Sequence, residues 1–455
     1  MTTTMHRRLD EALAAGTDLL LTDLRCPEAL LTEGAPAGAP VDADGTASVD
    51  LLLRAGRIAA VAAPGGAAAG APRLSLGGRH VWPMLVDAHT HLDKGHVIGR
   101  APSSGGTHPG AREATTRDRI AHWRHDDLIH RMDFGLSCAE AHGIAAIRTH
   151  LDSHEGQGET VWGAFAEIRE AWKGRVALQA SALVPFDAWG TDYAERLANI
   201  VADHGGLLGG VTRPSGGTHG GLADIDALLD RVFTLAKERD LDLDLHVDEA
   251  AEADALPHVA RATIRHGYEG RVTCGHCCSL SRLPEPEMDA TIALAKEAGL
   301  SLITLPTVNM YLQDRLPGRT PRWRGVMPIH ELRAAGVPVA VAGDNCRDPF
   351  YAYGDHDMLD TWREAVRICH LDHPFAGSAG LAGTAPAEIC GFEAGSLGAG
   401  RRADFMVLEA WSLDQLIARP QSDRVLVRQG RVLDLRAPSY EELRLTRTEA
   451  QVEPA

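Results

Sequence analysis

The sequence lacks a long apolar run of the kind that crosses a membrane. No stretch of about eighteen apolar residues occurs anywhere in its 455 residues. Close to the amino terminus, Leu19–Leu21 is too short for the apolar region of a secretory signal peptide, and Asp23 and Arg25 soon follow it. We therefore expect a cytoplasmic protein with no membrane partner.

Positive charge is also scarce. The chain has 45 Lys and Arg residues against 62 Asp and Glu residues, which gives a formal net charge of −17. This charge would repel a nucleic-acid backbone or an anionic membrane, so neither is expected as a partner. The 8 cysteines are scattered and form no small-domain disulfide framework, and in the cytoplasm we expect their thiols to be reduced.

Short strand patterns broken by turns occupy both ends of the chain. They are residues 18–22, 49–53 and 57–61 near the start, and residues 403–408, 425–427 and 431–433 near the end. The two ends of the chain thus share a strand-rich pattern that differs from the pattern of the middle region. We therefore expect one small β-sandwich domain built from residues 1–80 plus 398–440, followed by a tail over residues 441–455.

The middle of the chain alternates apolar strand patterns with helical patterns. The predicted strands are 85–88, 144–149, 176–183, 207–211, 241–247, 272–274, 302–305 and 337–342. The predicted helices are 161–172, 222–239, 257–266, 288–298 and 329–335. Alternating strands and helices imply parallel strands, and strands this apolar fit a sheet covered on both faces. The predicted fold class is therefore α/β, with a (β/α)8 TIM barrel over residues 81–397.

Polar side chains recur at the ends of these strands. His89 and His91 end the first strand, and because they are two residues apart they project to the same side of it. The others are His150 and Asp152 after the second strand, His246 and Glu249 after the fifth, His276 after the sixth, Asn309 after the seventh, and Asp344 and Asn345 after the eighth. The carboxyl ends of barrel strands meet at one face, and active sites lie there.

These residue types indicate a metal-dependent hydrolase. The expected metal ligands are His89, His91, His246 and Asp344. Three imidazoles and one carboxylate suit Zn²⁺ or Fe²⁺ and leave a position for water, whose pKa the metal would lower toward neutrality. Glu249 is the expected acid/base residue beside the metal, and His276 is a candidate to hydrogen-bond the nucleophile or the oxyanion.

Several nearby residues have a plainer interpretation. We interpret His150 as a hydrogen-bonded histidine at a strand end rather than a ligand. The run Cys274–Cys278 resembles part of a zinc knuckle, but no second cysteine pair lies at finger spacing, so its cysteines are interpreted as small buried residues. Lys94 is either a bridging ligand or a charge near the substrate.

Other histidines are expected to be solvated because they lie in polar stretches. These are His96, His108, His154 and His204. A different zinc design for nucleobase deamination combines His-x-Glu with Pro-Cys-x-x-Cys, and the chain has no Pro-Cys-x-x-Cys. That class of deaminase is therefore excluded.

The motifs together resemble those of the amidohydrolase superfamily and, within it, the bacterial cytosine deaminase group. The matching segments are residues 89–93, 148–152, 246–249, 308–315 with 324–325, and 343–345 with 348–351. The resemblance implies one Zn²⁺ or Fe²⁺ ion bound by the four expected ligands. It also implies Glu249 and Asp344 as proton carriers and His276 as activator of the hydrolytic water. The run Leu207–Val211 has no lysine that could bridge two metals, which fits a single metal ion.

The departures from the family pattern concern the substrate. A glutamine expected after the third strand is absent, and Pro185 stands in that stretch. The expected substrate-binding residues are Lys94, Pro185, Asn345 and Phe350. The segment from Gly95 to His125 is expected to be a long loop. Loss of a buried amide partner can change substrate selectivity by several kcal/mol.

These inferences predict a hydrolytic deaminase of cytosine or a related nucleobase-like cyclic amidine, which releases ammonia. The alternative within the superfamily acts on N-substituted triazines or on another cyclic amide. A catalytically silent, ligand-binding relative is the third hypothesis, but it predicts loss of a metal ligand, and all four are present. The expected partner is a small heterocyclic substrate, and the resemblance implies a homo-oligomer.

Overall fold

The computed structural model describes residues 4–66, 70–103, 105–421 and 423–445, and the chain divides into two compact units. The first unit comprises the chain up to Asp87 together with Glu140–Ala146 and Asp357–Arg436. The second comprises Ala88–Ala139, Ile147–His356 and the chain from Ala437 onward. Of the expected tail, residues 446–455 lie outside the described residues, whereas Glu442–Leu445 forms the short helix α14.

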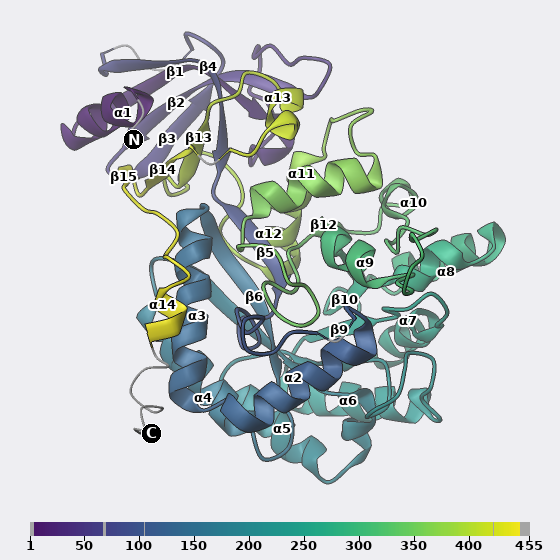
Figure 1. Cartoon of the computed structure of the whole chain (residues 1–455). Helices are drawn as coiled ribbons and strands as arrows, with labels where there is room; N and C mark the ends of the chain where they lie inside the picture. Colours follow the sequence, from purple (N-terminus) through teal and green to yellow (C-terminus); the bar gives the residue numbers. More distant parts are fainter. Residues whose placement is uncertain (1–3, 67–69, 104, 422, 446–455) are drawn as a thin grey trace, which may run out of the picture. The chain divides into compact units, whose positions relative to one another are not determined.

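A seven-stranded sheet assembled from both ends of the chain forms the first unit (Figure 1). Its order is β15 (Arg431–Leu433), β14 (Val425–Arg428), β13 (Phe405–Leu408), β4 (Arg73–Pro83), β1 (Leu19–Pro27), β2 (Thr46–Arg54) and β3 (Arg57–Ala62). The strands β1 and β4 are parallel, while β13 joins β4 in antiparallel register. The sequence predicts a sandwich of two sheets, but hydrogen bonding joins these strands in one sheet.

Four helices accompany this sheet within the first unit: α1 (Thr4–Ala14), α11 (Met358–Cys369), α12 (Thr384–Cys390) and α13 (Leu413–Ala418). The start of α11 is fixed by Asp357, whose carboxylate accepts from the backbone N–H groups of Leu359 and Asp360. The same carboxylate forms a partly buried two-point ion pair with Arg424, at 2.9 and 2.5 Å. This pair joins the helix to the last part of the first unit.

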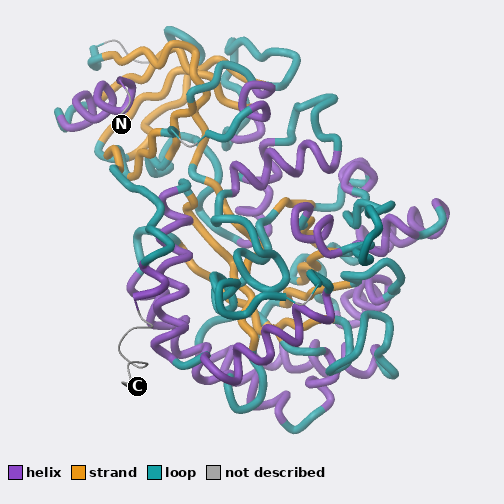
Figure 2. The backbone as a smooth tube through the Cα atoms, in the orientation of Figure 1, coloured by secondary structure: helices purple, strands orange, loops and turns teal. Residues whose placement is uncertain are grey.

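The predicted strands of the middle region all occur, in two sheets, and the five strands of the larger sheet are parallel. One sheet has the order β5 (Leu85–Thr90), β6 (Ile144–Asp152), β7 (Ala177–Leu183), and the other β12 (Val339–Val341), β11 (Ser301–Thr304), β10 (Val272–His276), β9 (Leu243–Val247), β8 (Leu208–Val211). Isolated parallel bridges connect Ser181 with Leu207 and Thr90 with Asp344. Almost every strand residue is buried, which explains the unbroken apolar runs of the sequence. Figure 2 shows these strands in orange with helices around them.

Helices lie between these strands in the sequence. They are α2 (His108–His122), α3 (His125–Ala141), α4 (Gly158–Ala171), α5 (Tyr193–Asp203), α6 (Ile225–Arg239), α7 (Ala255–His266), α8 (Glu285–Glu297), α9 (Pro306–Leu312) and α10 (Ile329–Ala334). Consecutive helices from α4 to α8 pack against one another. The protein is thus an α/β protein with a parallel sheet covered by helices.

The expected long loop from Gly95 to His125 is wrong in its second half, which forms α2. Thr107 caps this helix by accepting from the backbone N–H of Gly110, and Pro109 lies in its first turn. Both are ordinary helix-start signals, which the low apolar content of the segment obscures. No helix among the described residues is long and apolar enough to span a membrane, and all the cysteines are buried.

Candidate active site

Four side chains expected to bind metal converge at the strand ends of the second unit. The Nε2 atom of His246 lies 3.2 Å from that of His89 and 3.4 Å from that of His91. Asp344 Oδ1 lies 3.2 Å from His91 Nε2 and 3.7 Å from His89 Nε2. Ligands about 2.0–2.1 Å from a tetrahedral zinc are separated by roughly 3.4 Å. The donor atoms are therefore spaced as a divalent metal requires.

The protonation of these histidines also fits metal binding. Burial, followed by the charges of neighbouring histidines and Lys94, lowers the pKa of His89 and His91 well below the ordinary value, and burial and neighbouring histidines do the same for His246. Neutral imidazole is the form that binds metal. The Nδ1 atom of His91 donates to the carbonyl of His150 at 3.3 Å, which leaves its Nε2 lone pair directed at the cluster.

Backbone contacts hold Asp344 against the end of β5. The N–H of Asp344 donates to the carbonyl of His89 at 2.7 Å, and the Thr90 hydroxyl donates to the carbonyl of Asp344 at 2.8 Å. Asp344 has a φ of 66°, in the left-handed region that non-glycine residues seldom adopt. Such strain is typical of functional sites, because the surrounding structure must maintain it.

Glu249 lies beside the cluster rather than within it. Its Oε1 is 3.8 Å from His276 Nδ1, and its Oε2 is 3.3 Å from His108 Nε2. Burial alone would raise the pKa of Glu249, but His276 and His108 outweigh it and lower the pKa. Glu249 is therefore a carboxylate, which can accept a proton.

His276 is oriented by Asn309, whose amide nitrogen donates to His276 Nδ1 at 2.9 Å. The other ring nitrogen, Nε2, is buried and has no hydrogen-bond partner among the described residues. The ring therefore carries its proton on Nε2, and this N–H is available as a donor to a bound molecule.

A cavity of about 520 Å³ opens onto these groups, and His91, His246 and Asp344 form part of its wall. The four residues expected to bind substrate all line it: Lys94, Pro185, Asn345 and Phe350. Lys94 is buried and forms an ion pair with Asp152 at 2.7 Å, and its Nζ lies 5.5 Å from the centre of the Phe350 ring. A volume of this size accommodates a small-molecule substrate.

His150 does not match its interpretation as a hydrogen-bonded histidine. Neither ring nitrogen has a hydrogen-bond partner in the part of the chain that the structure describes, and Nε2 lies 3.8 Å from Asp244 Oδ1. Asp244 is engaged by Arg148 at 3.0 Å. His150 instead packs against His89, with ring centres 3.9 Å apart, and so helps to fix that ring.

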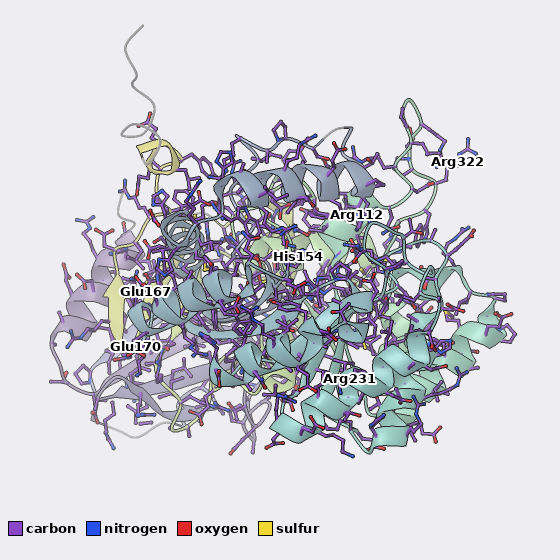
Figure 3. The ribbon with its side chains drawn as sticks, turned by 90° about the horizontal axis from the view of Figure 1, so that it is seen from below. Arg112, His154, Glu167, Glu170, Arg231 and Arg322 are labelled. Carbon is purple, nitrogen blue, oxygen red and sulfur yellow. The ribbon has the colours of Figure 1, made fainter. Side chains whose placement is uncertain are left out.

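Histidines expected to be solvated are placed differently by the structure. His108 contacts Glu249, and His154, labelled in Figure 3, lines the cavity. His96 is only 8% exposed and lies near Cys346 and His356. The expectation is wrong for these three because helix α2 and the loops fold over the strand ends, which no local pattern reveals.

Comparisons with known proteins identify the family of the chain. The model of the amidohydrolase family matches residues 162–436. The chain is 46% identical over 404 residues to a pterin deaminase of Rhizobium rhizogenes, which covers 88% of this chain and 91% of that protein. It is 27% identical over 375 residues to an N-isopropylammelide isopropyl amidohydrolase of Pseudomonas sp., which covers 78% and 86%.

A solved structure shows the same fold. The 5-methylcytosine deaminase of Klebsiella pneumoniae, liganded with 5-fluorocytosine, matches with a TM-score of 0.76 at 21% identity, over 92% of this chain and 98% of that chain. The extent of the family match and the identity to the Rhizobium protein leave no other assignment. The chain belongs to the amidohydrolase family.

Proposed function

We propose that this protein is a metal-dependent hydrolase that removes an amino group from a heterocyclic ring and releases ammonia. The observation that carries the proposal is the convergence of four donor atoms beside Glu249 and His276, at one wall of the cavity. The residues His89, His91, His246 and Asp344 would hold one divalent ion, Zn²⁺ or Fe²⁺. Such an ion lowers the pKa of water and so supplies a nucleophile at neutral pH.

Different side chains around this centre carry out the separate proton transfers. Glu249, an ionised carboxylate beside His276, collects a proton from water and delivers it to the ring nitrogen next to the amino-bearing carbon. Asp344 can carry a second proton to the departing amine. His276 donates from Nε2 to the developing oxyanion, and Asn309 holds the ring in that orientation.

We infer that the substrate is a nucleobase-like ring and that a pterin is a better candidate than cytosine. The relative named pterin deaminase is 46% identical, whereas the 5-methylcytosine deaminase structure is 21% identical. Pro185 offers no side-chain amide for a pyrimidine edge, and the cavity of about 520 Å³ has room for a two-ring system. N-substituted triazines remain the second candidate, because a relative at 27% identity is named for that chemistry.

We also propose that strands β5 to β12 close into a (β/α)8 barrel. The order of the two sheets supports this, because the bridges Ser181–Leu207 and Thr90–Asp344 join them at both edges. In such a barrel the active site lies at the carboxyl ends of the strands, which is where the four proposed ligands lie. A homo-oligomer located in the cytoplasm remains a prediction from the sequence.

The test is ammonia release by protein reconstituted separately with Zn²⁺ and Fe²⁺. Pterin, cytosine and an N-isopropyl triazine are the substrates, and alkylamine release is followed for the triazine. The proposal is supported if the protein releases ammonia from pterin and does not act on cytosine or on the triazine. Full metal occupancy with no ammonia released from any ring contradicts it.

A matched pair of variants tests the acid/base role. Glu249→Gln should retain metal but lose about 10²- to 10⁴-fold in kcat, because amide cannot transfer the proton. Glu113→Gln is the control, since Glu113 also lines the cavity but pairs with Arg117 at 2.7 Å. Activity of Glu249→Gln equal to that of the control would remove Glu249 from the mechanism.

A further inference from the structure

Two arginine side chains reach the cavity from different segments. Arg112 belongs to α2 and is labelled in Figure 3, and Arg213 follows the end of β8. Both line the cavity, and both are half-buried. The same space that holds the reacting groups is therefore bounded by two guanidinium groups.

Neither guanidinium has a carboxylate within ion-pair distance among the residues that the structure describes. Arg112 donates to the carbonyl of Gly217, and Arg213 donates to the carbonyl of Pro214 at 3.3 Å. The Nε atoms of both arginines are buried and have no hydrogen-bond partner there. Each side chain thus keeps donors that nothing in the described chain satisfies.

The acidic groups around the cavity are already engaged elsewhere. The pairs are Glu113 with Arg117 at 2.7 Å, Asp152 with Lys94 at 2.7 Å, and Glu249 with His108 at 3.3 Å, while Asp344 lies among the expected ligand histidines. Within the described part of the chain, Arg112 and Arg213 therefore have no direct ion pair, and the nearby carboxylate of Glu249 acts on them only through space.

The arginines that are more deeply buried in the described part of the chain are all in ion pairs. Arg148 contacts Asp244 at 3.0 Å, and Arg131 contacts Asp127 at 2.9 Å. This contrast matters because a buried charge without a partner is costly. The two cavity arginines differ from these arginines in facing a space that a ligand can fill.

The electrostatic situation of the pair is unfavourable without an anion. Burial lowers the pKa of both guanidiniums, and for Arg213 the neighbouring charge of Arg112 lowers it further, while the carboxylate of Glu249 offsets only part of this effect. An anion bound between them would remove this repulsion and use the unsatisfied N–H groups. A guanidinium matches a carboxylate through two parallel hydrogen bonds.

We propose that Arg112 and Arg213 form a subsite for a carboxylate substituent of the heterocyclic substrate. The inference rests on the proposed function and narrows its substrate class to amino-heterocycles that bear a carboxylate. Ring and substituent share the one cavity, so the carboxylate sets the position of the ring relative to Glu249 and the metal ligands. Binding energy from this remote group would then contribute to orienting the amino-bearing carbon.

The experiment compares pterin with its 6-carboxylate in metal-loaded, full-length protein. For the wild type, kcat/KM should be about 10- to 100-fold higher for the carboxylate, as expected for hydrogen bonds between charged groups. Arg213→Met and, independently, Arg112→Met should reduce this ratio by a similar factor, mainly through KM. Arg231→Met is the control and should leave the ratio unchanged, since Arg231 pairs with Glu195 at 2.6 Å and does not line the cavity.

The outcomes separate the subsite from the function. If pterin is deaminated but its carboxylate has no advantage, or if the arginine variants keep that advantage, the subsite is overturned and the proposed function stands. If neither compound releases ammonia, the choice of pterin fails. A third compound, the phosphate ester of 6-hydroxymethylpterin, distinguishes the anion, because an arginine-dependent preference for it over the carboxylate overturns the assignment to carboxylate. If both arginine variants fail to fold, the ratio of kcat/KM for the carboxylate to kcat/KM for pterin in the wild type tests the subsite by itself.

Discussion

The position of Gly275 provides a direct test of the metal centre. Gly275 lies in β10 and pairs with His246 of β9. A Cβ atom added there would lie 2.8 Å from His89 Cε1 and 2.9 Å from His89 Nδ1. Carbon atoms in contact are normally about 3.5–4.0 Å apart. Gly275→Ala must therefore displace the His89 ring.

The size of the effect follows from that displacement. Without a backbone shift, the added Cβ would lie about 0.7–1.2 Å too close to His89 Cε1, whereas a metal–ligand distance tolerates about 0.2 Å. We expect metal affinity to fall by about 10- to 100-fold, which corresponds to roughly 1.4–2.8 kcal/mol. Overpacking should also lower the free energy of unfolding by about 1–3 kcal/mol.

The measurement is metal competition against a chromophoric chelator, with thermal unfolding followed in parallel. Gly163→Ala is the control, because Gly163 lies in α4 and nothing is within 4 Å of its added Cβ. It should bind metal as the wild type does and be slightly more stable, since alanine favours helix by about 0.5–1 kcal/mol. A folded Gly275→Ala protein with wild-type metal affinity would refute the placement of His89 as a ligand.

Three further predictions concern metal removal, a partly buried ion pair and a helix cap. Dialysis against a chelator should abolish turnover until Zn²⁺ or Fe²⁺ is returned, whereas His246→Ala should bind less than one metal ion per chain by elemental analysis and should not recover. Arg424→Met should lower the free energy of unfolding by about 1.5–3 kcal/mol at neutral pH in chemical denaturation, because it leaves the partly buried Asp357 without its ion-pair partner. Burial raises the pKa of Asp357, but Arg424 lowers it more, so the pKa of Asp357 is lower in the folded protein than in the unfolded chain. The stabilisation by the ion pair is therefore present above the unfolded pKa of about 3.9 and is lost as the pH falls further. The stabilities of the wild type and the variant should accordingly converge in acid. Thr107→Ala should remove the cap of α2, with a loss of about 1 kcal/mol in thermal unfolding and a higher KM, and an unchanged KM would contradict a role for α2 in the cavity.

Much of the fold is predictable because its signals are local. Each strand from β5 to β12 is an apolar run bounded by polar residues, and all of these strands appear close to their predicted limits. The helix α2 is less visible, because its few buried positions are alanine and polar residues rather than large apolar ones. The sheet of the first unit is harder still, since pairing β13 with β4 depends on residues more than three hundred positions apart, such as Met406 and Trp82.

The sequence by itself determined which residue types meet at the proposed metal centre. Side chains two apart on a strand share a face, so His89 and His91 had to project together, and a histidine and an aspartate at two later strand ends completed a recognisable ligand set. These are properties of short segments and of residue types.

Only the tertiary structure decided which groups surround that chemistry. The contact between His108 and Glu249, the packing of His150 on His89, and the approach of Arg112 and Arg213 to one cavity each join segments that are distant along the chain. Their positions depend on how α2 and the loops lie over the strand ends, and this arrangement is set by the packing of whole elements rather than by the pattern of any one of them.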